Sequence, residues 1–416
     1  MRILKLTPRM EKWLLSRRAQ QDAEAHAIAS EIVSDVRRRG DAALFEWMKK
    51  LDEVNLAKTG VWIPEKEIRD ATRRVSREFV KAVEKAAANV RTVAEKQLPR
   101  PWSVETERGV KIAQIVRPIE AIGCYIPGGR FSLFSTLVMT AVPAQVAGVP
   151  RIVAVCPKPN PELLATAKIL SVEEIARIGG AQAIAALAYG TKSVPRVDKI
   201  FGPGNRYVTA AKQIVSRECA VDLPAGPTEA IIFADRGNPR WIAADLIAQA
   251  EHAEDAASFF ITTSRSLARE VQREIHWQLE ELPAGIARVS TEVAGAILLA
   301  SSLDQACEFI NRFAPEHLSL PENGAKLLSK IKAAGTIFLG PWGAQPLGDY
   351  ATGSNHVLPT GGWARRRGGL STADFVKCIS VQTIERDGFS RLADAVETLA
   401  ESEGLLAHRN AVRVRR

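Results

Sequence analysis

Gln249 and His252 lie three residues apart in the stretch 245–252, whose apolar residues recur at helical spacing. On a helix this spacing places the amide and the imidazole on one face, one turn apart. Two such groups can hold one metal ion or one substrate. A solvated helix surface gives the same pattern, so the pair alone leaves both interpretations open.

The histidines supply further candidates. Two of the six, His26 and His276, fall in charged helical windows that are typical of a solvated surface. The four in denser polar surroundings are His252, His317, His356 and His408. Asp349 and His356 border a loop of glycine, threonine, serine and asparagine, and such loops commonly position the polar groups of a site.

Glu316 and His317 are an adjacent acid and base that follow Pro315 and precede an apolar run. Proton transfer needs a group that titrates near the working pH, which imidazole supplies. Neighbouring side chains of a regular element point in different directions, so both reach one pocket only on an irregular turn. A solvent-exposed pair is the alternative that the sequence leaves open.

Glu403 and His408 are five residues apart on the last predicted helix, so they do not share a face. At least one of them must point elsewhere or meet a partner chain. Pooling Gln249, His252, Asp349 and His408 gives a nitrogen and oxygen ligand set with one carboxylate. This set suits Zn²⁺, with Mn²⁺ as a substitute, although spacing alone does not select these four residues.

Two glycine-rich turns each follow an apolar run and precede a helical window. They are Tyr-Ile-Pro-Gly-Gly at 125–129 and Phe-Gly-Pro-Gly-Asn at 201–205. Glycine allows close approach of the backbone to a ligand, and the helix N-terminus behind it favours an anion. Neither turn is a Rossmann fingerprint, and Asp222, about twenty residues on, looks like the end of a strand. Ordinary β–α turns remain the alternative.

Length and composition limit the class of protein. The 416 residues are 25% charged and 46% hydrophobic, which is ordinary for a globular protein of two or more domains. The net charge of +9 suits an anionic ligand such as a dinucleotide, but the basic residues are scattered and no nucleic-acid motif occurs. The N-terminus lacks a signal-peptide core and the apolar runs are too short to cross a membrane. Five separated cysteines without a Cys-x-x-Cys motif indicate a reducing compartment, so we expect a cytoplasmic protein that binds neither nucleic acid nor membrane.

Apolar runs alternate with helical windows from about residue 119 onward, which predicts an α/β protein with parallel sheets. The predicted strands are 121–126, 151–155, 199–201, 230–233, 258–262, 296–300 and 336–339. The predicted helices among them are 135–147, 161–178, 205–216, 241–251, 267–279 and 303–312. Further predicted elements are helices at 19–39, 42–51 and 64–98, a hairpin of 103–107 with 110–116, and a last helix at 392–407. So many units favour two sheets.

The chain resembles the histidinol dehydrogenase family. Matching runs appear in the family order and cover roughly residues 30–412; they include 123–129, 139–144, 179–191, 202–209, 223–229, 249–252, 314–318, 348–360 and 407–411. The resemblance implies two incomplete Rossmann-like domains with helical extensions in an intertwined homodimer. The implied divisions are an extension at 1–23, a larger domain of 24–118 with 230–370 that carries the metal and catalytic residues, an inserted NAD-contacting domain at 119–229, and a dimerisation and substrate segment at 371–416.

The resemblance also implies residue roles. One Zn²⁺ per subunit is held by residues matching Gln249, His252, Asp349 and His408, and it holds the substrate. The positions that contact NAD are Tyr125, Gln182 and Asn205. The substrate positions are Thr228, Gln249, His252, Glu316, His317, Asp349, His356, Glu403 and His408. Thr228 replaces a more usual serine and keeps the hydroxyl, and the segment with Glu403 and His408 reaches the partner's site.

The implied reaction oxidises L-histidinol to L-histidine through bound L-histidinal with two NAD⁺, in the last steps of histidine biosynthesis. His317 takes the hydroxyl proton, and Glu316 activates the water that adds to the aldehyde. The stretch 130–135 and the basic stretch 363–367 depart from the family pattern. They leave another small alcohol, such as a sulfonated diol, as the alternative substrate. A metallohydrolase is disfavoured because no His-Glu-x-x-His occurs, and the acid–base pair argues against a non-catalytic binding protein.

Overall fold

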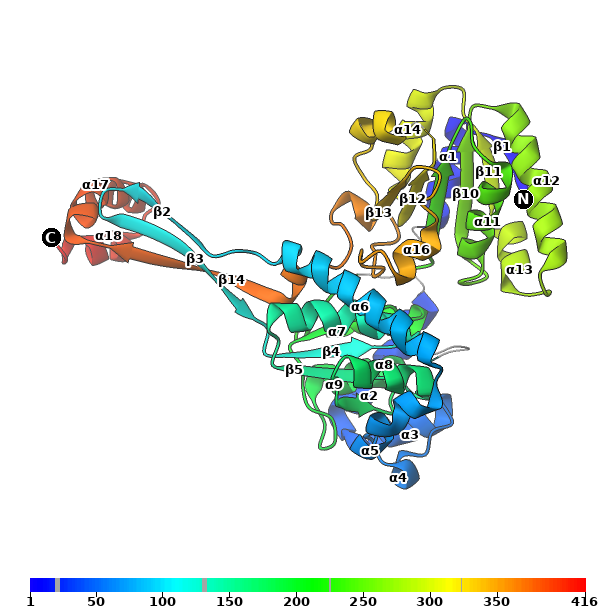
Figure 1. Cartoon of the computed structure of the whole chain (residues 1–416). Coiled ribbons are helices and arrows are strands. Elements are labelled where there is room, and N and C mark those ends of the chain that lie inside the picture. Colours follow the sequence, from blue (N-terminus) through cyan, green and yellow to red (C-terminus); the bar gives the residue numbers. More distant parts are fainter. Residues whose placement is uncertain (19–22, 129–132, 224–225, 323) are drawn as a thin grey trace.

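The computed structural model describes residues 1–18, 23–128, 133–223, 226–322 and 324–416. These residues form two α/β lobes, each built around a parallel sheet, and a long arm that projects from one lobe (Figure 1). The parallel α/β prediction is therefore confirmed. In the described part of the chain, no helix is long and apolar enough to cross a membrane.

The first lobe contains a six-stranded parallel sheet in the order β1-β11-β10-β9-β12-β13. Its strands are β1 (Arg2–Lys5), β9 (Glu229–Phe233), β10 (Ala257–Thr262), β11 (Ala296–Leu299), β12 (His317–Leu320) and β13 (Thr336–Leu339). Its helices are α1 (Pro8–Arg18), α11 (Pro239–Ala250), α12 (Arg265–Glu281), α13 (Ile286–Val293), α14 (Leu303–Phe313), α15 (Gly324–Leu327) and α16 (Gln345–Tyr350). Strand β9 is buried along its whole length, because α11 and α12 cover one face of the sheet and α1 and α14 the other.

The second lobe contains a five-stranded parallel sheet in the order β6-β5-β4-β7-β8. Its strands are β4 (Ala121–Tyr125), β5 (Arg151–Val155), β6 (Glu174–Ala176), β7 (Lys199–Phe201) and β8 (Ala220–Val221). Its helices are α7 (Phe134–Ala147), α8 (Pro161–Ile169), α9 (Gly180–Tyr189) and α10 (Arg206–Val215). The chain runs outward from β4 through β5 and β6 and then returns to β7 on the other side of β4. The carboxyl ends of β4 and β7 therefore form the topological switch point at which ligands of such sheets bind.

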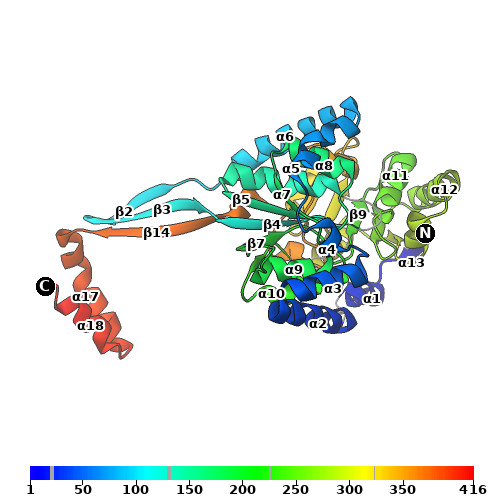
Figure 2. The same cartoon turned by 90° about the horizontal axis from the view of Figure 1, so that it is seen from below.

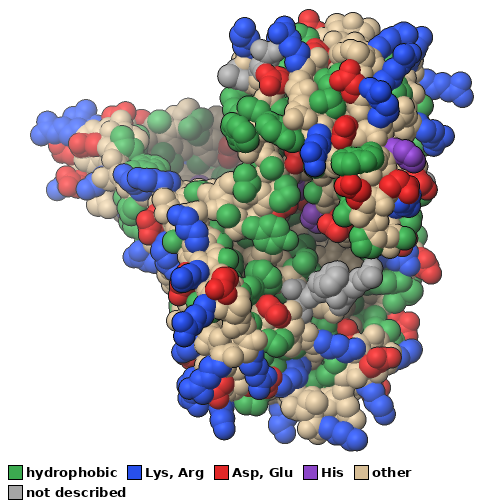
Figure 3. All heavy atoms as spheres, turned by 45° about the vertical axis from the view of Figure 1, so that its right-hand side comes forward, with side chains coloured by type: hydrophobic (Ala, Val, Ile, Leu, Met, Phe, Trp, Pro, Cys, Tyr) green, Lys and Arg blue, Asp and Glu red, His purple; other side chains and the backbone are tan. Residues whose placement is uncertain are grey.

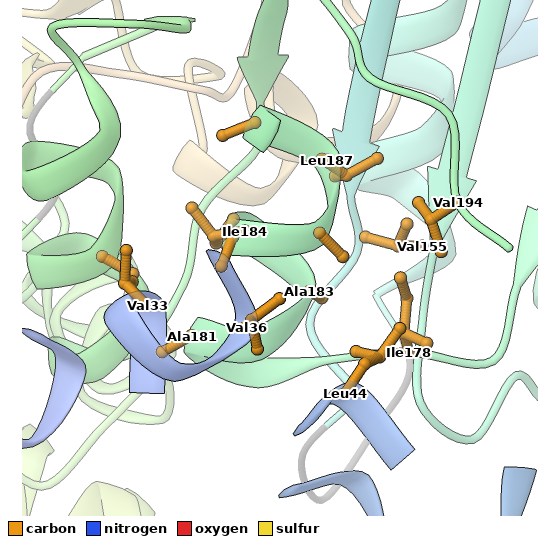
Figure 4. Close-up of a cluster of buried hydrophobic side chains, with 14 of the residues drawn as sticks. Val33, Val36, Leu44, Val155, Ile178, Ala181, Ala183, Ile184, Leu187 and Val194 are labelled. Atoms are coloured by element: carbon orange, nitrogen blue, oxygen red, sulfur yellow. The ribbon is translucent and has the colours of Figure 1, made fainter. Parts of the chain in front are cut away.

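The N-terminal helices also pack on the second lobe. They are α2 (Ala23–Arg39), α3 (Asp41–Leu51), α4 (Leu56–Thr59), α5 (Glu65–Asp70) and α6 (Arg77–Gln97), with a short 3₁₀ helix at Ala71–Arg74. Val33 and Val36 of α2 pack against Ala181 and Ile184 of α9 (Figure 4). We expected residues 24–118 to join 230–370 in one domain; the apolar faces of α2, α3 and α6 instead cover the sheet of the inserted domain.

Several predicted elements end differently in the structure. Helix α8 stops at Ile169, because Ser171 has a positive φ of 56°, and β6 follows where the helix 161–178 was predicted to continue. The predicted helix 64–98 is interrupted before Ser76, whose side chain caps α6 by accepting a hydrogen bond from Phe79 N at 3.0 Å. The extension at 1–23 is not only helical, since β1 pairs with β11 at the edge of the sheet.

The arm is an antiparallel sheet of three strands in the order β14-β3-β2. The strands are β2 (Trp102–Glu107), β3 (Val110–Pro118) and β14 (Val376–Ile384), and the helices α17 (Arg386–Ser402) and α18 (Leu406–Arg413) lie at the tip. Two more 3₁₀ helices, Trp363–Arg365 and Thr372–Phe375, precede β14, and one at Leu328–Lys330 follows α15. Figures 1 and 2 both show the arm extending away from the lobes. The hairpin prediction is confirmed, whereas β14 replaces the start of a segment predicted to be helical.

Candidate active site

The acid and base candidates lie at the amino ends of β9 and β12. Thr228 directly precedes β9, Glu316 directly precedes β12, and the two strands pair with His317 opposite Ala230. The Glu316 carboxylate accepts hydrogen bonds from the Thr228 hydroxyl and, at 3.0 Å, from Glu229 N. These two donors hold the carboxylate in one orientation.

Gln249 joins this cluster from the last turn of α11. Its side chain is 1% exposed, and its amide nitrogen donates a hydrogen bond to the Thr228 hydroxyl oxygen. The Thr228 hydroxyl in turn donates to Glu316, so the three side chains form one chain of hydrogen bonds. Because Thr228 occupies the amide nitrogen, the amide oxygen of Gln249 is the atom left for a ligand.

His317 is the first residue of β12 and is 3% exposed. Its Nδ1 lies 3.7 Å from Glu316 Oε2, and its Nε2 lies 3.4 Å from Asp349 Oδ1. Neither ring nitrogen has a hydrogen-bond partner among the described residues. Burial opposes protonation of this imidazole, but the charges of Glu316 and Asp349 outweigh it and raise the pKa of His317. A buried imidazole without a partner is suited to receive a group of a bound ligand.

Asp349 lies on α16, and its carboxylate faces the imidazole of His317. Burial would raise its pKa, but His317, His356 and His252 act in the opposite sense and lower it. His356 Nδ1 lies 2.7 Å from the backbone oxygen of Asp349, and burial lowers the pKa of His356. His252, exposed just beyond α11, acts electrostatically on both Asp349 and His356. Asp349 thus stays ionised among three imidazoles.

The donor atoms available to a metal in one chain are the Gln249 amide oxygen, the His252 imidazole and the Asp349 carboxylate. Such nitrogen and oxygen donors fit Zn²⁺. Among the described residues, no group of three or more histidine, cysteine, aspartate or glutamate side chains is arranged to hold a metal. His408, the fourth expected ligand, lies on α18, at the tip of the arm and away from the lobes (Figures 1 and 2).

Glu403 shares this remote position at the end of α17. The structure therefore brings together seven of the nine expected substrate residues and leaves Glu403 and His408 apart from them. Figure 3 shows a hollow where the two lobes meet, with a histidine side chain at its edge.

The expected NAD contacts lie around the switch point of the second lobe. Tyr125 ends β4, and its hydroxyl accepts a hydrogen bond from Gly180 N at 3.1 Å. Gln182 lies on α9, and its amide nitrogen donates to Asp52 Oδ2 at 2.7 Å. Asn205 caps α10 by accepting hydrogen bonds from the next turn. Burial raises the pKa of the Tyr125 hydroxyl, so this group remains a neutral hydrogen-bonding partner.

The two glycine-rich turns contact each other at this point. Gly202 has a positive φ of 114°, and a side chain there would meet the carbonyl oxygen of Tyr125. Gly128 leaves no room for a Cβ beside Pro157. Gly129, the end of the first turn, lies outside the described residues. Close packing, against the Tyr125 backbone at Gly202 and against the Pro157 ring at Gly128, explains why both turns contain glycine.

The segment 222–228 links the two sheets along the chain. It connects β8, at the carboxyl edge of the second sheet, directly to β9, at the amino edge of the first. Gly226 N donates to Thr360 Oγ1 at 2.6 Å and ties this segment to the first lobe. Residues 224–225 lie outside the described part of the chain.

Asp222 is not free to bind a ligand. Its carboxylate accepts hydrogen bonds from Gly202 N and Leu223 N, both at 2.7 Å, and from Lys212 Nζ. Lys212 also donates to the Gly202 carbonyl oxygen at 2.9 Å. This pair fixes the turn 202–205. Sequence reasoning missed Lys212, because a lysine in a helical window is ordinarily a surface residue.

Two arginines of the basic stretch 363–367 make contacts within the chain. Arg367 donates to the Asp222 backbone oxygen at 2.7 Å and to the Asp374 carboxylate at 2.8 and 2.9 Å. Arg366 lies over the Trp363 ring, 4.6 Å from its centroid. These contacts explain the presence of two of the three arginines, so an anionic substrate is not needed to explain them. Of the other departure, residues 130–132, including Arg130 and Phe131, lie outside the described residues.

The doubly wound parallel sheet of the second lobe and the buried Glu316–His317 pair of the first fit the class of α/β oxidoreductases. The comparisons narrow this class. The family model described as histidinol dehydrogenase matches residues 15–416, and the chain belongs to this family. Its members are oxidoreductases of histidine biosynthesis.

Individual relatives agree with this assignment. The histidinol dehydrogenase of Aquifex aeolicus is 44% identical over 415 residues, which cover 99% of this chain and 97% of the relative. That of Escherichia coli K12 is 41% identical over 416 residues, covering 98% and 95%. The crystal structure of histidinol dehydrogenase from Elizabethkingia anophelis superimposes with a TM-score of 0.94 at 37% identity, covering 100% of this chain and 98% of that one.

Proposed function

We propose that this chain oxidises L-histidinol to L-histidine through bound L-histidinal, with two NAD⁺ and one Zn²⁺ per subunit. The observation that carries the proposal is the buried imidazole of His317, placed between the carboxylates of Glu316 and Asp349. A base in this environment accepts a proton readily, as the oxidation of an alcohol requires.

The chain's own residues supply the proton transfers. In the first oxidation His317 accepts the hydroxyl proton while the hydride passes to NAD⁺. Glu316, oriented by Thr228 and Glu229 N, then accepts a proton from the water that adds to the aldehyde. The hydrate then loses a hydride to a second NAD⁺ and its hydroxyl protons, through His317 and Glu316, to solvent, and becomes the carboxylate. Gln249, His252, Asp349 and His408 would hold Zn²⁺, or Mn²⁺ in its place, and this cation would orient the substrate through its imidazole and amino groups.

The stoichiometry tests this proposal. Purified protein with Zn²⁺ and excess NAD⁺ should form about two NADH per L-histidinol, because both oxidations occur on one bound substrate. Absorbance at 340 nm measures the yield, and chromatography identifies the product. A yield near one NADH contradicts the four-electron reaction. Inactivity with histidinol but turnover of a sulfonated diol supports the alternative substrate.

The arm supports a homodimer with shared sites. Leu399 and Leu406 at its tip, and Ile379 on β14, are exposed large apolar side chains. A sheet and helices of this kind gain stability when a second chain covers them. We propose that Glu403 and His408 act in the site of the second copy, since both lie on the arm.

Mixing two inactive variants tests the shared site. The chain with His408→Ala and the chain with His317→Ala are each expected to be inactive. After subunit exchange, a heterodimer regains one complete site, so an equal mixture recovers roughly a quarter of the wild-type sites by random pairing. If His408 acted within its own chain, each site would keep one defect. Confirmed exchange without any recovery of activity contradicts the shared site.

A further inference from the structure

We propose that Asp52 is a further cofactor-binding residue, which holds the adenosine ribose hydroxyls of the dinucleotide and favours NAD⁺ over NADP⁺. This inference rests on the proposed use of NAD⁺. Dinucleotide-binding sheets of this strand order place an acidic side chain on the ribose, at the end of the strand next to the first one. The question is which acid serves in this chain.

Asp222 does not serve, although its spacing from the turn 201–205 matches the expectation. Its side chain is 1% exposed, and three donors already occupy its oxygens. The strand next to β4 is β5, and it continues as Cys156-Pro157-Lys158, which contains no acid. The ribose-binding carboxylate must therefore come from another segment.

Asp52 reaches this place from the C-terminal end of α3. Its carboxylate accepts a hydrogen bond at 2.7 Å from the amide of Gln182, which is an expected NAD contact. The charge of Asp52 also acts on the hydroxyl of Tyr125, a second expected contact, and that of Lys158 acts on Asp52. Asp52 thus lies beside two of the three residues expected to bind the cofactor, and at the end of β5.

The Asp52 carboxylate has capacity left for a ligand. The Gln182 bond is the one side-chain hydrogen bond it makes among the described residues, and a carboxylate has about four acceptor positions. The residue is half-buried, so part of it stays open to solvent. Burial raises the pKa of Asp52, which agrees with a carboxylate that lacks full compensation. Two ribose hydroxyls would supply the missing donors.

Gln182 holds this carboxylate in position. A Cβ on Gly180, which has a positive φ of 64°, would meet the Gln182 side chain, so the amide is packed against the backbone. The Gln182 amide nitrogen also lies 3.3 Å from Met48 Sδ, and its oxygen has no hydrogen-bond partner among the described residues. The unpartnered oxygen, buried beside Asp52, is a second polar atom suited to a ligand.

Charge determines the cofactor preference. A carboxylate accepts both hydroxyls of an unmodified ribose, but it repels the 2′-phosphate of NADP⁺. Lys158 acts on Asp52 from an exposed position just beyond β5, where solvent and salt screen its charge. The site therefore has an acid where NADP⁺ would need a base.

Variants of Asp52 test the inference. In Asp52→Ala we expect the KM and the dissociation constant for NAD⁺ to rise about tenfold or more, with the KM for L-histidinol nearly unchanged. In Asp52→Asn, which still accepts the Gln182 hydrogen bond, we expect the ratio of kcat/KM for NADP⁺ to that for NAD⁺ to rise about tenfold. Glu53→Gln removes the adjacent exposed charge. It should change neither the KM for NAD⁺ nor the ratio of kcat/KM for NADP⁺ to that for NAD⁺.

The measurements separate this inference from the proposed function. Isothermal titration of NAD⁺ and NADP⁺ requires no turnover, so it tests Asp52 even if L-histidinol is not oxidised. An unchanged NAD⁺ dissociation constant in both Asp52 variants overturns the role of Asp52 and leaves the proposed function intact. An equal response in Glu53→Gln also overturns it, because the effect is then one of net charge. A wild-type chain that binds neither dinucleotide overturns both proposals.

Discussion

Replacing His317 with alanine is expected to lower kcat for L-histidinol oxidation by about 10³-fold while the zinc content stays at one per subunit. His317 is the group proposed to accept the hydroxyl proton, and no other imidazole lies between the carboxylates of Glu316 and Asp349 in the described part of the chain. The proposed metal donors remain in this variant. Steady-state kinetics gives the loss of activity, and atomic absorption after dialysis gives the zinc content.

His252→Ala is the matched variant, because it removes an imidazole of the same cluster that has a different proposed role. It should lose zinc as well as activity, since His252 is the one imidazole among the three proposed ligands that come from the lobes. Added Zn²⁺ should restore part of the activity of His252→Ala and none of that of His317→Ala. Loss of zinc from His317→Ala would show that the division between base and ligand is wrong.

The strands were predicted best where the apolar run is uninterrupted and the flanking residues are polar or glycine. β5, β7 and β13 have the predicted bounds; β5 and β7 are largely buried, and β13 is an edge strand whose apolar run is bounded by glycines. Helix α9 was not predicted, since it is buried on all sides and shows no polar face. Strand β14 was missed because it belongs to an exposed arm whose pairing with β3 is distant in sequence.

Part of the candidate site could likewise be predicted from local sequence, and part could not. Local patterns indicated the pairs Gln249 with His252 and Glu316 with His317, because short spacing fixes how side chains lie on one element. Their meeting depends on the pairing of β9 with β12, which no local pattern contains. Family resemblance supplied the grouping that spacing left open. Asp52 carried no signal at all, since an acid at the end of a helix is ordinarily a solvated residue.

Replacing Lys212 with methionine is expected to lower the free energy of unfolding by about 3 to 5 kcal/mol. Lys212 and Asp222 are 4% and 1% exposed, so the substitution leaves a carboxylate buried without its cation. Gly202 N and Leu223 N still donate to Asp222, but the Gly202 carbonyl oxygen loses its donor. Urea denaturation followed by circular dichroism measures the loss.

Lys212→Met should also weaken the binding of NAD⁺. Its affinity for NAD⁺ should fall further below the wild-type value than its affinity for L-histidinol. The Lys212–Asp222 pair holds both the N–H and the carbonyl of Gly202, and this turn ends in the cap of α10 at the proposed cofactor crevice. Lys85→Met, on the exposed side of α6, is the control and should change stability by less than about 0.5 kcal/mol.

The double variant Lys212→Met with Asp222→Asn removes the uncompensated charge and should regain part of the lost stability, because a buried pair is costly chiefly when one partner is missing. If the double variant is less stable than Lys212→Met alone, the hydrogen bonds of Asp222 to the turn, and not its pairing with Lys212, stabilise this lobe.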